Sequence, residues 1–468
     1  MTAHDPRHDL THTPHVSPPP SPLPNAAFLR HGALLTACAV LLGACSGGCN
    51  LDTITGEPTP VAPTYNIVAT VSGLVGSGLV LQNNGSNNLA VSGNGIAVFS
   101  AHLASGARYA VSVLQDPASP GQYCQVAQGG GTVGTADVSN ISVVCRSGVR
   151  AAYVANAGSN TVSQYAVSPT DGSLSAIAPG AATTDTTPTR LAIAPSGLYA
   201  YATNSASNTV SQFALAADGA LSALAPVSVA TGINPNGVAL DPGGKYAYVV
   251  NTTGNTVSQF NVSVVDGSLS AMAPATVLTG NAPRSITVHP GGKYAYAVNE
   301  TGNTVSQYTV SAFNGTLTAM ATPVVATGPT PKSLAIDPSG SFAYVANFGS
   351  NTVSQFTISP TNGSLAPMAT STATTELNPT GMVVEPTGRF LYVANFGSNT
   401  VSQFRIGAGG ALTAIAVAVA SHGITPAAVA TDASGRYAFV SNLGSNTVAQ
   451  YTISATDGSL TPMALSTV

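Results

Sequence analysis

The sequence of 468 residues has few charged side chains and contains no tryptophan. Charged residues make up only 6% of it, with 13 basic against 17 acidic side chains and a net charge of −4. No stretch gathers lysine and arginine into a basic surface, which excludes a nucleic-acid partner. The 48 glycines and 32 prolines instead indicate many turns, as in a secreted or surface β-protein with more than one domain.

Cysteine is also scarce, and no pattern of cysteines and histidines in the chain resembles a zinc site, so we expect no metal and no cofactor. Cys38 lies in an apolar segment that we expect to be cleaved, and Cys45 follows that segment directly. Cys124 and Cys145 are left to form a disulfide if the chain enters an oxidising compartment, and Cys49 has no evident partner.

The N-terminal 44 residues are typical of a leader and signal peptide. Four histidines in residues 1–28 suggest either metal binding or an unstructured leader that precedes the true start. Arg30 then precedes a short apolar run from Ala33 to Leu42, too short to span a membrane. Leu42-Gly-Ala-Cys45 resembles the bacterial lipobox, although an ordinary cleavage site beside a chance cysteine is the alternative.

That resemblance implies that Cys45 carries a lipid anchor and that residues 45–64, rich in Gly, Thr and Pro, form a tether. Ser46 after the cysteine implies the outer membrane of a bacterial cell envelope, facing the periplasm or the cell surface. Residues 65–146 follow as a set of short alternating strands with close turns, which predicts a small Ig-like β-sandwich.

Residues 147–468 are built from one repeat. An Asn-Thr-Val triplet recurs seven times at intervals of 47 or 48 residues, beginning at Asn160 and ending at Asn446. A period of this length signals a propeller or a solenoid, and each copy reads as strands without helix. We therefore predict an all-β protein: a seven-bladed β-propeller with four antiparallel strands per blade, most simply a monomer.

One copy illustrates the four strands of a blade. Pro331–Pro338 predicts an inner strand, Phe342–Asn347 a second and Thr352–Ser359 a third, and Asn362-Gly363 predicts a type I′ hairpin into the fourth strand at Leu365. A proline-bounded inner strand occurs in only six copies. Ser142–Cys145 either supplies the inner strand of the first blade or ends the preceding domain.

The fourth copy departs from the others at two positions. Glu300 is the only ionisable residue directly after the asparagine that ends the second strand, and Arg284 enters the inner strand of the same blade. Antiparallel pairing places both at one mouth of the central channel, where they form either a site or a surface ion pair. His289 follows Ser285 by four residues, or about 13 Å along the inner strand, which predicts a turn residue on the opposite face.

Pro283-Arg-Ser-Ile-Thr-Val-His-Pro290 and Val298-Asn-Glu300, within repeats such as Tyr153-Val-Ala-Asn156, resemble the seven-bladed lactonase family, which includes 6-phosphogluconolactonases. The resemblance implies that Arg284 and Glu300 are catalytic, without metal. It implies that Asn236, Ser285, Asn299 and Lys332 contact the substrate. The chain departs from the family at Asn236 and Ser285, where the family has histidines.

Two functions follow from these residues. The first is hydrolysis of a small lactone by an envelope lipoprotein, with Arg284 stabilising the oxyanion and Glu300 orienting or deprotonating water. The second is a non-catalytic surface propeller that binds a ligand or a protein. The membrane is a partner in both, through the lipid anchor.

Overall fold

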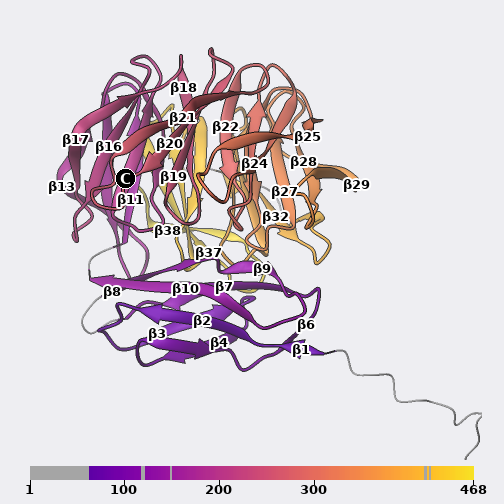
Figure 1. The fold of residues 1–468 in the computed structure, drawn as a ribbon. Coiled ribbons are helices and arrows are strands. Elements are labelled where there is room, and N and C mark those ends of the chain that lie inside the picture. The colour runs from indigo at the N-terminus through magenta and orange to yellow at the C-terminus, as the bar shows by residue number, and fades with distance from the viewer. Residues whose placement is uncertain (1–62, 118–121, 148–149, 416–418, 421–422) are drawn as a thin grey trace, which may run out of the picture. The chain divides into compact units, whose positions relative to one another are not determined.

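The computed structural model describes residues 63–117, 122–147, 150–415, 419–420 and 423–468, and every regular element in them is a β-strand. Figure 1 shows these strands in chain order. No helix among the described residues is long and apolar enough to cross a membrane. The predicted leader, Cys45 and the tether as far as residue 62 lie outside the described residues.

The first ten strands form two four-stranded sheets, in the orders β5-β2-β10-β8 and β4-β3-β7-β9, with β1 paired to β6. Their bounds are β1 Thr64–Tyr65, β2 Ile67–Ser72, β3 Leu79–Asn83, β4 Asn87–Val91, β5 Gly95–Val98, β6 Leu103–Ala104, β7 Arg108–Gln115, β8 Gln122–Ala127, β9 Gly130–Thr132 and β10 Val138–Ser147. Both sheets contribute to one apolar core that includes Ile67, Leu81 and Val113. A disulfide joins Cys124 to Cys145, which lie opposite each other on β8 and β10. The Ig-like assignment of this region stays a prediction.

The remaining strands form seven antiparallel sheets, the blades of the predicted propeller. Blades 1 to 4 are β11 Arg150–Asn156, β12 Thr161–Val167 and β13 Leu174–Thr183; β14 Pro188–Ile193, β15 Tyr199–Asn204, β16 Thr209–Leu215 and β17 Leu221–Ala230; β18 Pro235–Leu240, β19 Tyr246–Asn251, β20 Thr256–Val262 and β21 Leu269–Leu278; β22 Pro283–Val288, β23 Tyr294–Asn299, β24 Thr304–Val310 and β25 Leu317–Ala326. Blades 5 to 7 are β26 Pro331–Ile336, β27 Phe342–Asn347, β28 Thr352–Ile358 and β29 Leu365–Thr374; β30 Pro379–Val384, β31 Phe390–Asn395, β32 Thr400–Ile406, β33 Leu412–Ala414 and β34 Val419–Ala420; β35 Pro426–Thr431, β36 Tyr437–Asn442, β37 Thr447–Ile453 and β38 Leu460–Thr467.

In blades 2 to 7 the second strand is almost entirely buried, which explains why most of its residues are apolar or small. Every residue of β27 is buried, with Tyr344 fully so, and the Tyr344 hydroxyl donates a 2.7 Å hydrogen bond to the Gly410 carbonyl of the next blade. The same tyrosine–glycine bond recurs between other neighbouring blades, as from Tyr296 to Gly363. One side chain therefore both fills the space between two blades and anchors the neighbouring hairpin.

The hairpin between the third and fourth strands is present as predicted, but its turn type is not. In the copy at Asn362-Gly363 only the glycine has a positive φ, of 74°, whereas a type I′ turn needs two such residues. The Asn362 side chain instead accepts hydrogen bonds from Ser364, as Asx turns do. Glycine is required because a Cβ at Gly363 would also lie 2.4 Å from the ring of Tyr294.

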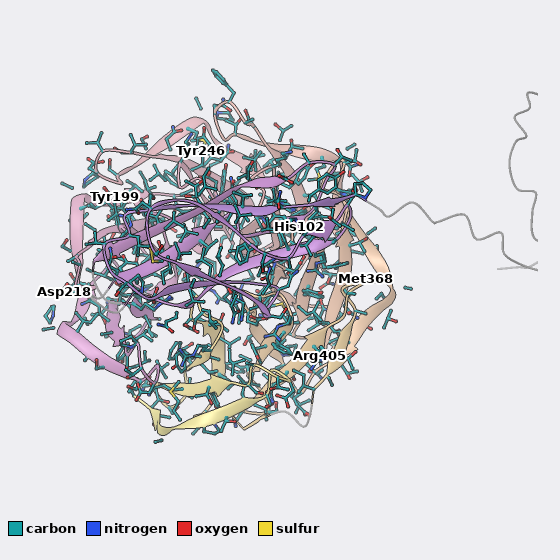
Figure 2. The ribbon with its side chains drawn as sticks, turned by 90° about the horizontal axis from the view of Figure 1, so that it is seen from below. His102, Tyr199, Asp218, Tyr246, Met368 and Arg405 are labelled. Carbon is teal, nitrogen blue, oxygen red and sulfur yellow. A yellow bond between two sulfur atoms is a disulfide. The ribbon has the colours of Figure 1, made fainter. Side chains whose placement is uncertain are left out.

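A glutamine at the centre of each third strand links the blades into a closed ring. Its Oε1 accepts a hydrogen bond of 2.5–2.7 Å from a backbone N–H on the fourth strand of the neighbouring blade. The bond from Leu174 to Gln450 joins the last blade to the first. In Figure 2 the blades follow one another around the ring, with Tyr199, Tyr246, Met368 and Arg405 on blades 2, 3, 5 and 6.

Blade 1 has three strands in the structure, whereas four were predicted for every blade. Ser142–Cys145 lies in β10, which pairs with β2 and β8, so this segment ends the N-terminal region and does not supply an inner strand. The inner edge of β11 consequently has no neighbouring strand within the described part of the chain.

Candidate functional site

Blade 4 brings the predicted catalytic pair together. The Arg284 Nε lies 3.0 Å from one carboxylate oxygen of Glu300, and the Lys332 Nζ of blade 5 lies 2.5 Å from the other. The side chains of Lys332 and Glu300 are 17% and 21% exposed, and that of Arg284 is 35% exposed. Glu300 is thus held between two cations at the end of its strand, with little side-chain surface left open to water.

The backbone of β22 explains the position of Arg284. Pro283 pairs with Asn299 and Ser285 with Val298, so Arg284 is an extra residue in a bulge between the two pairs. A β-bulge redirects the side chain of the inserted residue. The N–H of Glu300 donates to the carbonyl of Ala282 at 2.9 Å, which fixes the start of β22 beside the end of β23.

A cavity of about 1130 Å³ includes Arg284, Asn236 and Arg190 in its wall, whereas Glu300 and Lys332 do not line it. Burial lowers the pKa of the Arg190 guanidinium, and repulsion from Arg284 lowers it further. Within the described residues the structure records no hydrogen bond or ion pair for the Arg190 side chain. Two guanidinium groups that share one cavity wall favour an anionic group as ligand.

Arg190 was not anticipated, although the sequence contains a signal for it. The third residue of the inner strand is small in the other five copies. These residues are Gly237, Ser285, Ser333, Gly381 and Ala428. Space is tight there, since a Cβ at Gly237 would lie 2.7 Å from the Cα of Ser285. An arginine at this position breaks the repeat as strongly as Glu300 does.

The remaining predicted contact residues are placed differently. Asn236 is 6% exposed and lines the cavity, and its backbone carbonyl accepts a hydrogen bond from the Thr203 hydroxyl. The buried Ser285 Oγ has no hydrogen-bond partner. Asn299 is fully buried, and its amide donates to Thr304 and to Ser306 within the blade. Of these residues only Asn236 lines the cavity, whereas Asn299 repeats the bonds of its equivalents in other blades, such as Asn251.

His289 occupies the turn after β22, on the opposite end of the strand from Arg284 as predicted. Its Nδ1 accepts a hydrogen bond from the Gly291 N–H, and its Nε2 lies 2.9 Å from the Gly340 carbonyl. Asp241 caps the equivalent turn in blade 3 with its carboxylate. Burial lowers the pKa of His289, which is consistent with a neutral ring that donates through Nε2. His289 is a structural residue.

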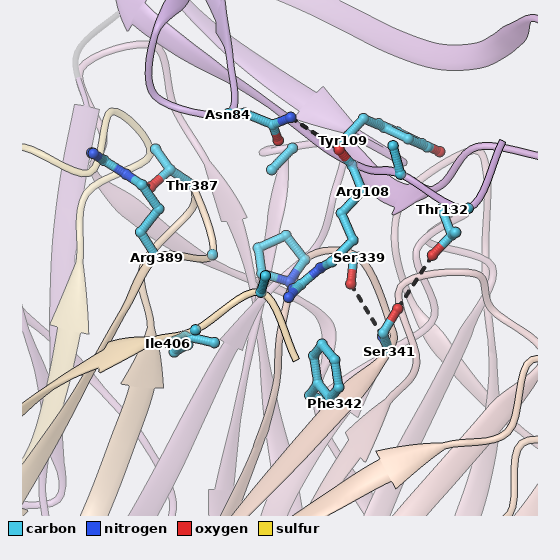
Figure 3. A pocket seen from close by; sticks show the side chains of 17 residues that line it. Asn84, Arg108, Tyr109, Thr132, Ser339, Ser341, Phe342, Thr387, Arg389 and Ile406 are labelled. Carbon is cyan, nitrogen blue, oxygen red and sulfur yellow. Dashed lines mark hydrogen bonds between the residues drawn. The ribbon is translucent and has the colours of Figure 1, made fainter. Parts of the chain in front are cut away.

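A second cavity, of about 550 Å³, lies between β7 and the turns of blades 5 and 6 (Figure 3). Arg108 forms an ion pair with Asp337 there and its guanidinium lies 4.7 Å from the ring centre of Phe342. The hydroxyls of Thr132 and Ser341 are 3.3 Å apart. These polar groups satisfy one another, so we do not assign a ligand to this cavity.

No group of three or more histidine, cysteine, aspartate or glutamate side chains in the described part of the chain could hold a metal ion.

The seven antiparallel sheets are the blades of a seven-bladed β-propeller. Three overlapping stretches, residues 79–330, 237–419 and 308–467, match the family described as Lactonase, 7-bladed beta-propeller. The chain belongs to this family.

Solved structures with the same fold include a putative 6-phosphogluconolactonase from Bacteroides uniformis, with a TM-score of 0.60 and 21% identity over 69% of this chain and 97% of that one. The periplasmic gluconolactonase of Pseudomonas aeruginosa gives a TM-score of 0.55 and 20% identity over 68% and 95% of the two chains. A protein from Lactobacillus plantarum gives 0.57 and 22% over 65% and 91%. A search of curated proteins found no match. At these identities the likeness shows the fold alone.

Proposed function

We propose that the propeller hydrolyses a small lactone at the channel mouth of blade 4. The observation that carries this proposal is the carboxylate of Glu300, fixed between Lys332 and Arg284, of which Arg284 also lines the cavity of about 1130 Å³. Family membership supports the reaction class, and the neighbouring structures support the fold.

In this reaction a water molecule adds to the lactone carbonyl, and the ring C–O bond then breaks to give a hydroxy acid. The Glu300 carboxylate takes a proton from the water as its oxygen attacks, and the proton is returned to the alkoxide that leaves. Arg284 stabilises the negative charge on the carbonyl oxygen. Neither Asn236 nor Ser285, at the positions of the family's histidines, can act as a base near neutral pH, so Glu300 is the base.

Arg190 narrows the class of lactone that the cavity would accept. Its partly buried guanidinium faces the cavity without an acceptor among the described residues, so a lactone with a carboxylate or phosphate substituent fits better than a neutral one. The test is a panel of neutral and anionic lactones, with acid release followed by pH-stat titration. Wild-type protein without activity on any lactone of the panel contradicts the proposal.

One feature favours the second candidate, a non-catalytic binding propeller. Both oxygens of Glu300 already have a cationic partner, so an incoming water competes with Arg284 or Lys332 for the carboxylate. Equilibrium dialysis with a non-hydrolysable cyclic analogue of an anionic lactone separates the two functions. Binding of the analogue without turnover of the matching lactone identifies the binding propeller.

We also propose that Cys45 anchors the chain to a membrane of the bacterial envelope. The support is the sequence Leu42-Gly-Ala-Cys45 after a short apolar run, and residue 45 lies outside the described residues. A lipid anchor would hold the propeller at the membrane surface, where it would act on lactones or surface ligands outside the cytoplasm.

A further inference from the structure

The first blade differs from the other six because its second strand has a free inner edge. In blades 2 to 7 an inner strand pairs with the second strand, whereas β11 pairs only with β12. All seven residues of β11 are half-buried, whereas its counterpart β27 is buried throughout. An unpaired strand edge presents a row of backbone N–H and C=O groups to a partner strand.

Each inner strand present in the structure is held at its start by two backbone hydrogen bonds. In blade 6 the residue before the first proline is Asn378, whose N–H donates to the side-chain oxygen of Asn351 in blade 5 at 2.8 Å. The carbonyl of Asn378 accepts from the N–H of Phe396, which follows the second strand of its own blade, at 2.9 Å.

The first of these bonds recurs at all six inner strands, with lengths of 2.7–2.8 Å. The second also recurs at all six. The pair of bonds is therefore a general anchor for an inner strand.

The same two anchors are present around blade 1, but nothing in the described part of the chain occupies them. The side-chain oxygen of Asn446 is the acceptor offered by blade 7, and the N–H of Ala157 is the donor after β11. Neither group makes a hydrogen bond to any described residue. Both residues line the cavity of about 1130 Å³, together with β11 and the facing residues of β35.

We propose that this groove binds an extended peptide segment of a partner protein, which pairs antiparallel with β11 and adds the fourth strand of blade 1. The register of blade 5 fixes the alignment, since Pro331 pairs with Asn347 and Leu334 with Val345 there. By analogy, the proline of the partner segment lies opposite Asn156, and the third residue after it lies opposite Val154. Main-chain hydrogen bonds supply the affinity and alternate side chains supply the specificity.

The six inner strands of the chain define the chemistry of the segment. After a proline come a variable residue, a residue that is small in five of six copies, and then apolar or small residues at the fourth and sixth positions. The residue before the proline has a φ of 51–60° in every copy, a conformation that asparagine and glycine adopt more readily than most residues. A segment of the form Asn-Pro-x-small-apolar-x-apolar therefore fits the groove. This inference goes beyond the proposed lactone hydrolysis, but the peptide would share the cavity lined by Arg190 and Arg284 and would therefore compete with an anionic lactone there.

A labelled peptide with the sequence of residues 374–386, which contains the inner strand of blade 6, is the probe. Fluorescence anisotropy with the folded chain should show saturable binding, and a scrambled peptide should not bind. The Asn446→Ala variant should bind the peptide about two- to tenfold more weakly, because it loses one hydrogen bond. Asn351→Ala is the matched control, because its asparagine holds an inner strand already present; it should lower the Tm and leave the peptide affinity unchanged.

A second variant carries residues 374–386 appended after Val468. In each blade the inner strand starts fourteen residues after the start of the preceding fourth strand, and this extension reproduces that spacing from Leu460. We expect a higher Tm and loss of peptide binding, since the appended strand occupies the groove. The proposal is overturned if the wild-type chain does not bind the peptide, or if the extended variant binds it as tightly as the wild-type chain does.

Discussion

Replacement of Glu300 by glutamine tests the chemistry of the site with the smallest change in shape. Glutamine keeps the volume of the side chain but removes the charge that Arg284 and Lys332 share. The three side chains are partly buried, so the loss of folding free energy lies between that of an exposed pair and that of a buried one, about 1–2 kcal/mol. With an unfolding entropy of about 2.1 cal/mol/K per residue over roughly 400 residues, this lowers the Tm by only about 1–2 °C.

The effect on turnover should be much larger than the effect on stability. A general base contributes about 10²–10⁴ to a rate, so kcat/KM for lactone hydrolysis should fall by that factor in Glu300→Gln. Arg284→Ala should lower it by about 10²–10³ through loss of one oxyanion donor. Glu376→Gln, in an exposed loop, makes the same chemical change away from the site and should leave both Tm and turnover unchanged.

The assay is initial-rate titration of released acid at several lactone concentrations, with the Tm of each variant measured in the same buffer. Turnover by Glu300→Gln within about tenfold of the wild-type value would refute the assignment of Glu300 as the base. A fall in turnover with a Tm drop well beyond 2 °C would show that the carboxylate mainly supports the fold.

Three further predictions concern other parts of the chain. His289→Asn should leave turnover unchanged and flatten the pH dependence of the Tm. Because the pKa of His289 is lowered in the folded chain, the unfolded chain takes up the proton at a higher pH, and the stability that neutral His289 contributes is lost as the pH drops below about 6.5. Thermal melts from pH 8 to pH 5 measure this loss. Replacing both Cys124 and Cys145 by alanine should destabilise the N-terminal region by about 3 kcal/mol, measured by calorimetry; a reductant that leaves the wild-type melting profile unchanged would contradict a stabilising role for the disulfide. Metabolic labelling with a palmitate analogue should mark the wild-type chain but not Cys45→Ala, and equal labelling of both would disprove acylation at that residue.

The repeat made the architecture predictable from the sequence. The limits of β27 and the start of β29 agree with the pattern of apolar residues, prolines and glycines, because the second strand of blades 2 to 7 is almost entirely buried. The turn type at Asn362-Gly363 was predicted wrongly because the dipeptide rule assumes a two-residue loop. The structure instead uses a longer loop in which only Gly363 needs a positive φ.

Parts of the site were less predictable. Strand pairing predicts that Arg284 and Glu300 lie close together. It does not predict the bulge that redirects Arg284 or the position of Lys332 on the next blade, because both depend on tertiary geometry. Arg190 was not predicted because it lies two residues after its proline, whereas the prediction rested on the residue directly after each proline. The sequence also could not show whether the first blade has an inner strand, since the apolar residues of Ser142–Cys145 suit both that strand and the end of the preceding domain. In the structure they pair with β2 and β8 and so belong to the N-terminal region.

The glutamine hydrogen bonds that close the ring also affect which blades pack against each other as the chain folds. Every junction between two blades uses the same glutamine hydrogen bond, so the contact surface of a blade hardly distinguishes its correct neighbour from another blade. The length of the connections distinguishes the correct neighbour. Only four residues join one blade to the next at 184–187 and at 375–378, and four residues span at most about 14 Å. These short tethers keep the adjacent blade at a high local concentration, and blade order is therefore encoded by connection length. When two unfolded chains meet at high concentration, the same uniformity lets a blade of one dock onto a blade of the other, and refolding from dilute solution should give the higher yield of monomer.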